Sequence, residues 1–276
     1  MESHELTAHG VTQRAAHDMA ARLLRGAGRA SLVAYADPEL ADLETLAHCW
    51  SDELGGLLVA VIPPRGRRLG APVQVRLGID KLAPLASVGV LTASLHSLAE
   101  LWPLGRGQAE ALADPPAELA GLIGCDDVLL ALVLPQRLLL HAHGQVAEID
   151  RALALQSTPW PLHADELAAV ELVESHGEAQ LAHWASMVSQ GDWPGDGSGV
   201  VLHQKLCTSL AHRAMVVDVA PQGLTVMVTT ADRVQTVQVD FAHRVGSLRA
   251  LRQEVLRIAF QNPALPELWD ATESGA

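Results

Sequence analysis

The sequence has 276 residues, of which 49% are hydrophobic and only 3% aromatic, so the chain can form one or two packed cores built mainly from aliphatic side chains. Its formal net charge of −13 at pH 7 argues against a nucleic-acid-binding protein, which needs a basic surface to neutralise phosphates, and against adhesion to an anionic membrane. The 3 cysteines are widely spaced and form no CxxC pair, which argues against a disulfide framework or a zinc site and favours the reducing cytoplasm.

The N-terminal half is typical of one helix followed by many short strands. After a frayed start over residues 1–9, apolar residues at helical spacing predict a helix over Val11–Leu24. A second, short helix is expected over Glu110–Leu122, where two prolines interrupt its beginning. Strands are predicted over Ala30–Ala36, Leu46–Trp50, Leu57–Ile62, Val73–Ile79, Val88–Leu98, Val128–Leu134, Leu138–His143 and Val146–Ile149. This succession of short strands favours a β-barrel.

A second region follows the proline-containing linker Gln156–Pro161. One long helix is predicted over Asp165–Val188, because its apolar residues fall on one face. A flexible loop over Gly191–Gly199 and another helix over residues 200–211 are expected to follow.

The clearest pattern in the chain is an antiparallel meander that ends in a helix. Alternating apolar residues predict strands over Met215–Val219, Leu224–Val228 and Val237–Phe241, with tight turns between them. The apolar spacing then changes to that of a helix that begins near Leu248, with Ser247 as its N-cap. We expect a sheet with one wet face and one dry face, the dry face being covered by this final helix.

The segment VDFAHRVGSLRALRQEVLRIA, which closes the meander, resembles the C-terminal module of the HugZ/HutZ-type haem-utilisation family. The same module occurs in plant glutamyl-tRNA-reductase-binding proteins and in many actinobacterial proteins. The resemblance covers residues about 163 to 260. It implies an N-terminal split β-barrel of the pyridoxamine-phosphate-oxidase (PNPOx-like, FMN-binding split barrel) type, and it implies a homodimer that binds its ligand at the subunit seam.

The expected fold class is therefore α+β: a split β-barrel followed by a small α+β domain with a three-stranded antiparallel meander and packing helices. The expected domains are residues 10–155 for the barrel and residues 160–262 for the α+β module, with a tail over residues 263–276.

The resemblance also suggests residues that could bind a ligand. His176 matches the second histidine of a His-x-x-x-x-His pattern at which the family's helix opens, whereas Glu171 replaces the first. His243, Arg244 and Arg249 lie where the last strand meets the last helix, and they could hold a haem propionate or another carboxylate. The family takes its axial histidine from near the chain end, but no histidine follows His243 here. The alternative is that His176 is a structural helix residue and that the residues at the junction are ordinary surface charges.

Two further groups arise from the barrel region. Arg65, Arg67 and Arg68 form a basic loop, and Arg76 and Lys81 follow on the next strand. The resemblance identifies this cluster as the place for a flavin phosphate; a solvated loop is the alternative. His141 and His143 have the i,i+2 spacing that puts two side chains on one face of a strand, which could hold two ligands of a metal site or could be a polar face near a turn.

No nucleophile motif, P-loop or dinucleotide fingerprint is present, so the sequence does not identify a reaction. The cysteines are expected to be inert thiols in apolar surroundings. The favoured hypothesis is a haem-binding or haem-handling protein, with a tetrapyrrole as its ligand. The alternatives are a non-catalytic regulatory or binding protein and an FMN-binding oxidoreductase.

Overall fold

The computed structural model divides the chain into two compact units, one formed by residues 1–81 and 93–162 and the other by residues 82–92 and 163–276. The residues that it describes are 2–35, 42–64, 69–84, 89–112, 115–142, 144–157, 160–196, 201–203 and 211–261. The predicted tail over 263–276 lies outside them. None of the described helices combines the length and the apolar character needed to cross a lipid bilayer.

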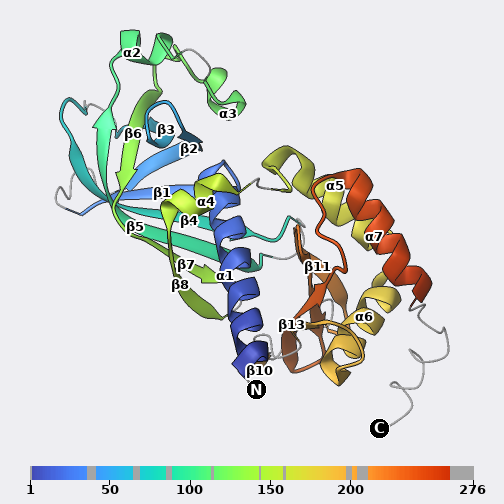
Figure 1. Cartoon of the computed structure of the whole chain (residues 1–276). Coiled ribbons are helices and arrows are strands. Elements are labelled where there is room, and N and C mark those ends of the chain that lie inside the picture. Colours follow the sequence, from blue (N-terminus) through green and yellow to red (C-terminus); the bar gives the residue numbers. More distant parts are fainter. Residues whose placement is uncertain are drawn as a thin grey trace. The chain divides into compact units, whose positions relative to one another are not determined.

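The first unit is a closed antiparallel barrel with two added strands (Figure 1). Its strands are β1 (Arg29–Ala34), β2 (Asp42–Ser51), β3 (Gly56–Ile62), β4 (Val73–Leu82), β5 (Leu91–Pro103), β6 (Leu129–Pro135), β7 (Leu138–Ala142) and β8 (Gln145–Ile149). They follow the order β4-β1-β2-β3-β6-β5-β7-β8, and an additional β4–β5 pairing closes the barrel. Because β5 is long enough to pair with β7 along its first half and with β6 along its second, the sheet continues from the barrel into β7 and β8.

Aliphatic side chains from alternate positions of these strands fill the barrel. Leu77, Leu95 and Val133 are completely buried in one core cluster. Helix α1 (Glu2–Leu24) adds Leu23 and Leu24 to that cluster and runs alongside β8 and α4 (Arg151–Gln156). The helix therefore begins at Glu2 instead of Val11, and the prediction of a frayed start was wrong.

A small cap over β3 and β6 replaces the single helix predicted over Glu110–Leu122. It consists of α2 (Arg106–Glu110) and α3 (Ala117–Ala120), separated by the prolines that precede α3. Proline cannot donate the backbone hydrogen bond that a continuous helix requires, so the segment forms two short turns. Leu119 of α3 is completely buried against apolar residues of β3 and β6.

The second unit contains the predicted meander, extended by two short strands. Its strands are β9 (Gly195–Asp196), β10 (Val201–His203), β11 (Ala214–Ala220), β12 (Gly223–Thr229) and β13 (Arg233–Asp240). They follow the order β10-β13-β12-β11, with β9 also paired to β13. The helix predicted over residues 200–211 was wrong at 201–203, where the backbone pairs with β13, and residues 204–210 lie outside the described part.

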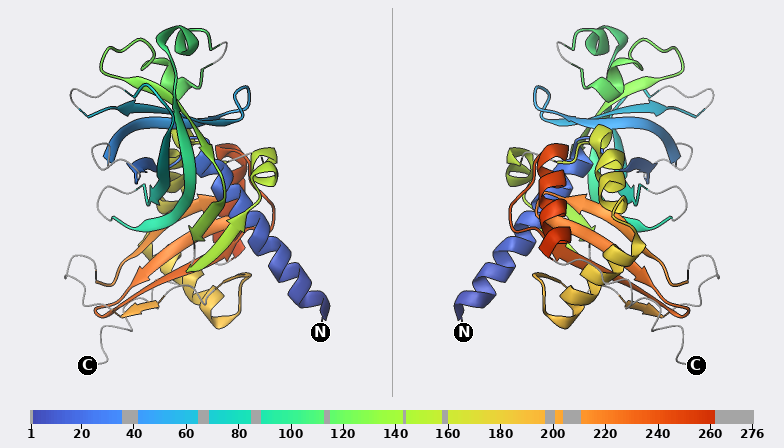
Figure 2. Two further views of the ribbon diagram at one scale, coloured as in Figure 1. Left: turned by 90° about the vertical axis from the view of Figure 1, so that its left-hand side faces the viewer. Right: turned by 90° about the vertical axis from the view of Figure 1, so that its right-hand side faces the viewer.

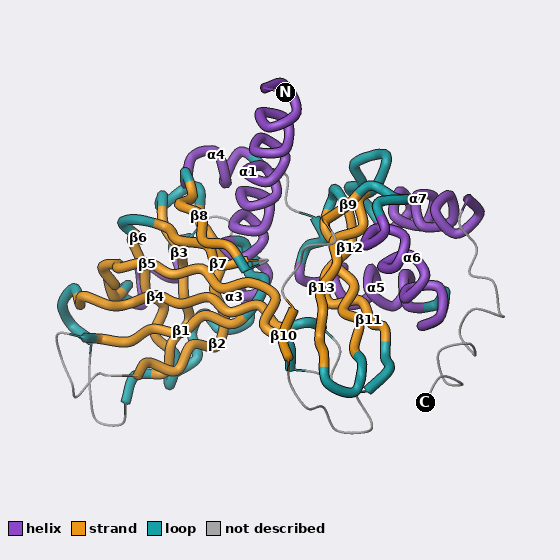
Figure 3. Tube along the Cα trace, turned by 90° about the horizontal axis from the view of Figure 1, so that it is seen from below, coloured by secondary structure: helices purple, strands orange, loops and turns teal. Residues whose placement is uncertain are grey.

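Three helices lie on one side of this sheet: α5 (His163–Glu174), α6 (Glu178–Gln190) and α7 (Leu248–Gln261) (Figure 3). The prediction of one helix over Asp165–Val188 was wrong, because a turn interrupts the helix between α5 and α6. Gly177 has φ +85° there, a left-handed conformation that a helix interior does not contain and that glycine adopts at little cost.

The final helix begins as predicted, since the Ser247 hydroxyl accepts a hydrogen bond from the Ala250 N–H at 3.2 Å. Its predicted apolar face is buried, with Leu251 and Val255 at 0% exposure. However, the main helical contacts with β11, β12 and β13 come from α5 and α6, and α7 packs against α5 (Figure 2). The prediction that the final helix covers the dry face of the sheet therefore needs correction.

The opposite face of the meander is also apolar, contrary to the prediction of a wet face. Met215, Val217 and Met227 form a cluster with Ala83 and Val90. The last two residues belong to the segment 82–92 between β4 and β5, which is part of the second unit. Cover on both faces explains why nearly every residue of β11 and β12 is buried. The predicted fold class, a barrel followed by a small α+β module, is confirmed.

Candidate functional site

A group of polar side chains gathers on the outward side of β4, β5 and β7. Along β4, Val75, Leu77 and Ile79 are completely buried in the barrel core, so the residues between them face outward. The same alternation along β5 turns Ser94 and His96 outward. Strand pairing therefore brings polar residues that are distant in the sequence onto one face.

A hydrogen-bonded chain links Asp80, Ser94 and His96. The Ser94 hydroxyl donates to the Asp80 carboxylate, and its oxygen lies 2.8 Å from Nε2 of His96. A hydroxyl has a single proton to donate, and an ionised carboxylate can only accept. Ser94 must therefore accept from the Nε2–H of His96. In the neutral His96 ring, Nδ1 is therefore the nitrogen that carries a free electron pair.

A second imidazole lies against the first. His141 on β7 is directly opposite Ser94 in the β5–β7 register, and its ring contacts His96 with centroids 5.2 Å apart and planes at 80°. His141 is exposed, and its ring nitrogens make no hydrogen bond among the described residues. A Cβ atom at Gly78 would lie too close to the Ser31 hydroxyl, at 2.9 Å, and in ordinary van der Waals contact with Nδ1 of His96, at 3.6 Å.

The surface around the two imidazoles is partly apolar. Leu98, two residues beyond His96 on β5, is 51% exposed, and Val146, directly opposite His141 on β8, is 61% exposed. Arg76, one of the predicted ligand residues, is exposed on the outward side of β4, two residues from Gly78. The site thus combines nitrogen donors, apolar surface and a cation on four adjacent strands, β4, β5, β7 and β8.

A second polar group continues the same face beyond Arg76. The Gln74 amide donates to Glu100 at 2.7 Å, and the Glu100 carboxylate also accepts from the Trp102 indole at 3.3 Å. The Tyr35 hydroxyl donates to Gln74 at 3.2 Å. These contacts fix the β4–β5 alignment on the outward side.

His176 takes a different place from the one predicted. It lies in the break between α5 and α6 instead of inside a long helix, and its ring contacts Trp184 with centroids 5.9 Å apart. Trp184 is 2% exposed and belongs to the face of α6 that packs on the sheet. The geometry gives His176 a packing partner at the α5–α6 turn, while its role as a ligand residue stays a prediction.

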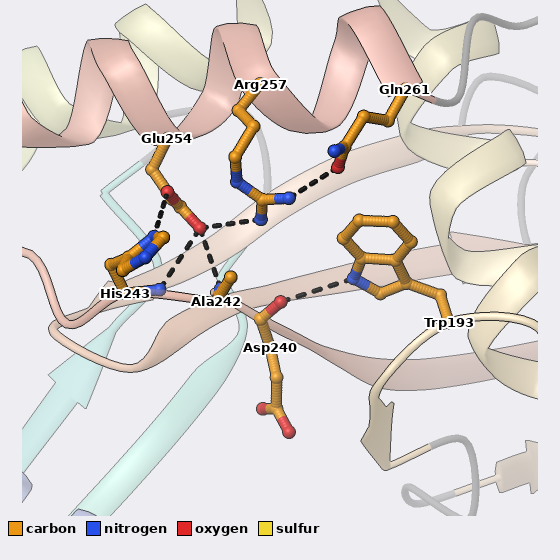
Figure 4. Close-up of polar contacts among 7 residues, drawn as sticks. All are labelled: Trp193, Asp240, Ala242, His243, Glu254, Arg257 and Gln261. Carbon is orange, nitrogen blue, oxygen red and sulfur yellow. Dashed lines mark hydrogen bonds and ion pairs between the residues drawn. The ribbon is translucent and has the colours of Figure 1, made fainter.

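The junction of β13 and α7 holds a carboxylate that the chain itself supplies (Figure 4). Glu254 of α7 accepts hydrogen bonds from the backbone N–H groups of Ala242 at 2.7 Å and His243 at 3.3 Å, and from Arg257 at 2.7 Å. Burial alone would raise the pKa of this carboxyl, but these donors lower it to about 2. Arg257 in turn lies over the Trp193 ring.

The hydrogen bonds of Glu254 occupy part of the carboxylate-binding site that was predicted at the same junction. The ring of His243 is 79% exposed and has Glu254 as its partner at 3.4 Å. Arg244 and Arg249 are exposed. The backbone donors of Ala242 and His243 already bind Glu254, so an external propionate would have to rely on the exposed side chains alone.

The remaining predicted residues are only partly described. Arg65, Arg67, Arg68 and His143 lie outside the described residues. Of the predicted flavin-phosphate cluster, Arg76 and Lys81 can be placed, both on β4: Arg76 is exposed and Lys81 is buried. The described residues contain no group of three or more His, Cys, Asp or Glu side chains that could hold a metal ion.

Sequence reasoning missed Asp80, Ser94 and His96. Ser94 and His96 occupy the polar positions of an alternating strand, which is a usable signal. Their partners Asp80 and His141 come from other strands, and a single sequence gives no register between strands.

Comparisons with solved structures include two weak likenesses. No family model and no curated protein matches the sequence. A haem-binding protein from Mycobacterium smegmatis is 16% identical with a TM-score of 0.48, and the match covers 90% of this chain and 96% of that one. A protein of unknown function from Agrobacterium tumefaciens is 14% identical with a TM-score of 0.32, covering 88% and 94%. Similarity at this level assigns neither a family nor a ligand to the chain.

Proposed function

We propose that the chain is a haem-binding protein whose haem is held on the outward side of β4, β5 and β7. The observation that carries the proposal is the pair His96–His141, in which one imidazole is oriented by a hydrogen-bonded carboxylate and hydroxyl and the other is exposed. Metal-ligating histidines characteristically donate their second ring N–H to such a partner, which fixes the ring and raises its basicity.

The residues present fit a haem bound through one imidazole. Nδ1 of His96 has a free electron pair, and His141 has ring nitrogens with no described hydrogen bond. The two rings cannot ligate opposite faces of one porphyrin, because they lie on the same side of the sheet with centroids only 5.2 Å apart. Haem held through one imidazole would supply an iron centre that can still bind a small molecule or another donor.

The surroundings suit the rest of the porphyrin. Leu98 and Val146 offer exposed apolar surface beside the imidazoles, against which a porphyrin plane can be buried. Arg76 supplies a guanidinium that can pair with a propionate in a charge-assisted hydrogen bond. The resemblance of residues about 163 to 260 to the haem-utilisation family also supports a tetrapyrrole ligand, although the proposed axial ligand comes from the barrel and not from the end of the chain.

A haemin titration followed by the Soret band tests the proposal. We expect saturable binding at one haem per chain, and the double variant His96→Ala/His141→Ala should lose at least tenfold in affinity. His163→Ala, which removes an exposed histidine at the start of α5, is the matched control and should bind as the parent does. Unchanged binding by the double variant, or no Soret band in the parent, would overturn the proposal.

The single variants assign the axial ligand. His141→Ala leaves the Asp80–Ser94–His96 chain in place, whereas Ser94→Ala removes the orientation of His96 and keeps both rings. If His96 is the ligand, Ser94→Ala should weaken haemin binding by roughly 10-fold or more, the cost typical of removing an outer-shell partner. The homodimer predicted from the resemblance is a separate proposal, which sedimentation equilibrium tests directly.

A further inference from the structure

We propose that His96 and His141 together chelate a divalent transition-metal ion that carries no porphyrin. When two imidazole nitrogens bind one ion at about 2.0–2.1 Å and at a roughly tetrahedral angle, the ring centroids lie roughly 5 Å apart. The observed separation of 5.2 Å matches this spacing. The backbone therefore already places the two rings at the distance that a shared ion requires.

Only a side-chain rotation separates the observed contact from a chelate. In the present arrangement the planes meet at 80°, so that the edge of one ring faces the other. His141 is exposed and has no described hydrogen bond, so its ring can turn at little cost. Ser94 holds Nε2 of His96, so Nδ1, which lies on the side of the ring that faces Gly78, is the nitrogen left for the metal.

The outer shell of this site is the kind that supports a metal ligand. Ser94 is 5% exposed and connects His96 to the carboxylate of Asp80, which places a negative charge one hydroxyl away from the ligating ring. A relay of this type raises the basicity of the free nitrogen and restricts the ring to one orientation. It also spreads part of the charge of a bound cation onto Asp80.

The ligand set determines the class of ion. Imidazole is a good ligand for Cu²⁺, Ni²⁺ and Zn²⁺, and Cu²⁺ binds most tightly among the divalent ions of this row. Because no third His, Cys, Asp or Glu joins the pair among the described residues, water must complete the coordination shell. A site of this composition exchanges its ion readily and competes with haem for the same two rings.

This inference does not rest on the proposed function, because metal binding is measured without haem. The probe is Cu²⁺, titrated into the full chain without an affinity tag, in a buffer that does not coordinate copper and only up to one equivalent, so that the tightest site fills before the other histidines. Electron paramagnetic resonance of the first equivalent should show hyperfine splitting from two nitrogen nuclei. Ser94→Ala should keep both nitrogens and weaken binding by roughly 10-fold.

The variants decide the outcome. His141→Ala should give a one-nitrogen signal with at least tenfold weaker affinity, and His163→Ala should match the parent. The proposal is overturned if His96→Ala/His141→Ala binds the first Cu²⁺ as tightly as the parent, or if the parent signal shows no paired nitrogens. A positive Cu²⁺ result with a flat haemin titration would remove the haem proposal and leave this one standing.

Discussion

The buried Glu254 carboxylate and its hydrogen-bond donors allow a prediction about stability. Its carboxylate is 7% exposed and accepts from two backbone N–H groups and Arg257. Replacing it in Glu254→Gln removes the negative charge and puts an amide where one acceptor oxygen stood. The pKa falls from the ordinary 4.5 to about 2 on folding, which corresponds to about 3 kcal/mol at pH 7.

The pH dependence of this contribution has a definite sign. A carboxyl whose pKa is lowered by folding stabilises the folded state above its unfolded pKa, and the contribution disappears as pH falls through the folded pKa. The advantage of the parent over Glu254→Gln should therefore be full above about pH 5 and should fall to about 1 kcal/mol at pH 3. Below pH 2 the two proteins should differ little, since the carboxyl is then protonated in both states.

Urea unfolding followed by circular dichroism at pH 7, 5 and 3 measures this difference. Glu171→Gln, at an exposed position of α5, is the matched control and should change stability by less than about 0.5 kcal/mol. A loss below 1 kcal/mol in Glu254→Gln at pH 7, or a loss that stays constant down to pH 3, would refute the reasoning.

Three other outcomes follow from burial and packing. Gly78→Val should displace His96 and weaken both haemin and Cu²⁺ binding at a stability cost of about 1–3 kcal/mol, checked by titration beside thermal unfolding. Burial raises the pKa of the Cys49 thiol to about 11, so at pH 8 Cys49 should react with a maleimide far more slowly than the exposed Cys125; equal rates, measured by peptide mass mapping, would contradict this. Leu251→Ala should destabilise the chain by about 2–5 kcal/mol, because this side chain is fully buried on α7, and urea unfolding would show it.

The meander could be predicted because its signal is local. Alternation over Leu224–Val228 and a change of period at Leu248 depend on neighbouring residues, and both appear at the expected positions. The Ser247 cap is equally local, since an N-cap hydroxyl bonds an N–H two or three residues along the chain. Patterns of this kind survive folding because the tertiary structure does not compete with them.

The errors arose where distant segments decide the structure. The break at Gly177 was missed because apolar residues keep a helical spacing on both sides of it, so a single glycine did not outweigh the pattern. The second apolar face of the meander is covered by Ala83 and Val90, far away in sequence, so no local pattern identified its partner. Cys125 was expected in apolar surroundings and is exposed.

The candidate site shows the same division. His141 was identified from the sequence but was paired with its neighbour His143, because i,i+2 spacing was the only visible relation. Its observed partner His96 lies on another strand, and the register between β5 and β7 creates the contact. Asp80 and Ser94 gain their significance only from their hydrogen bonds to each other and to His96.

The absorption spectrum of the protein purified from its own cells, before and after addition of haemin, tests the haem assignment most directly. A haem protein of the proposed kind should show a Soret band on isolation or develop one with saturable stoichiometry. Flavin bands in the isolated protein, or a colourless protein that stays without a Soret band after haemin is added, would contradict the account.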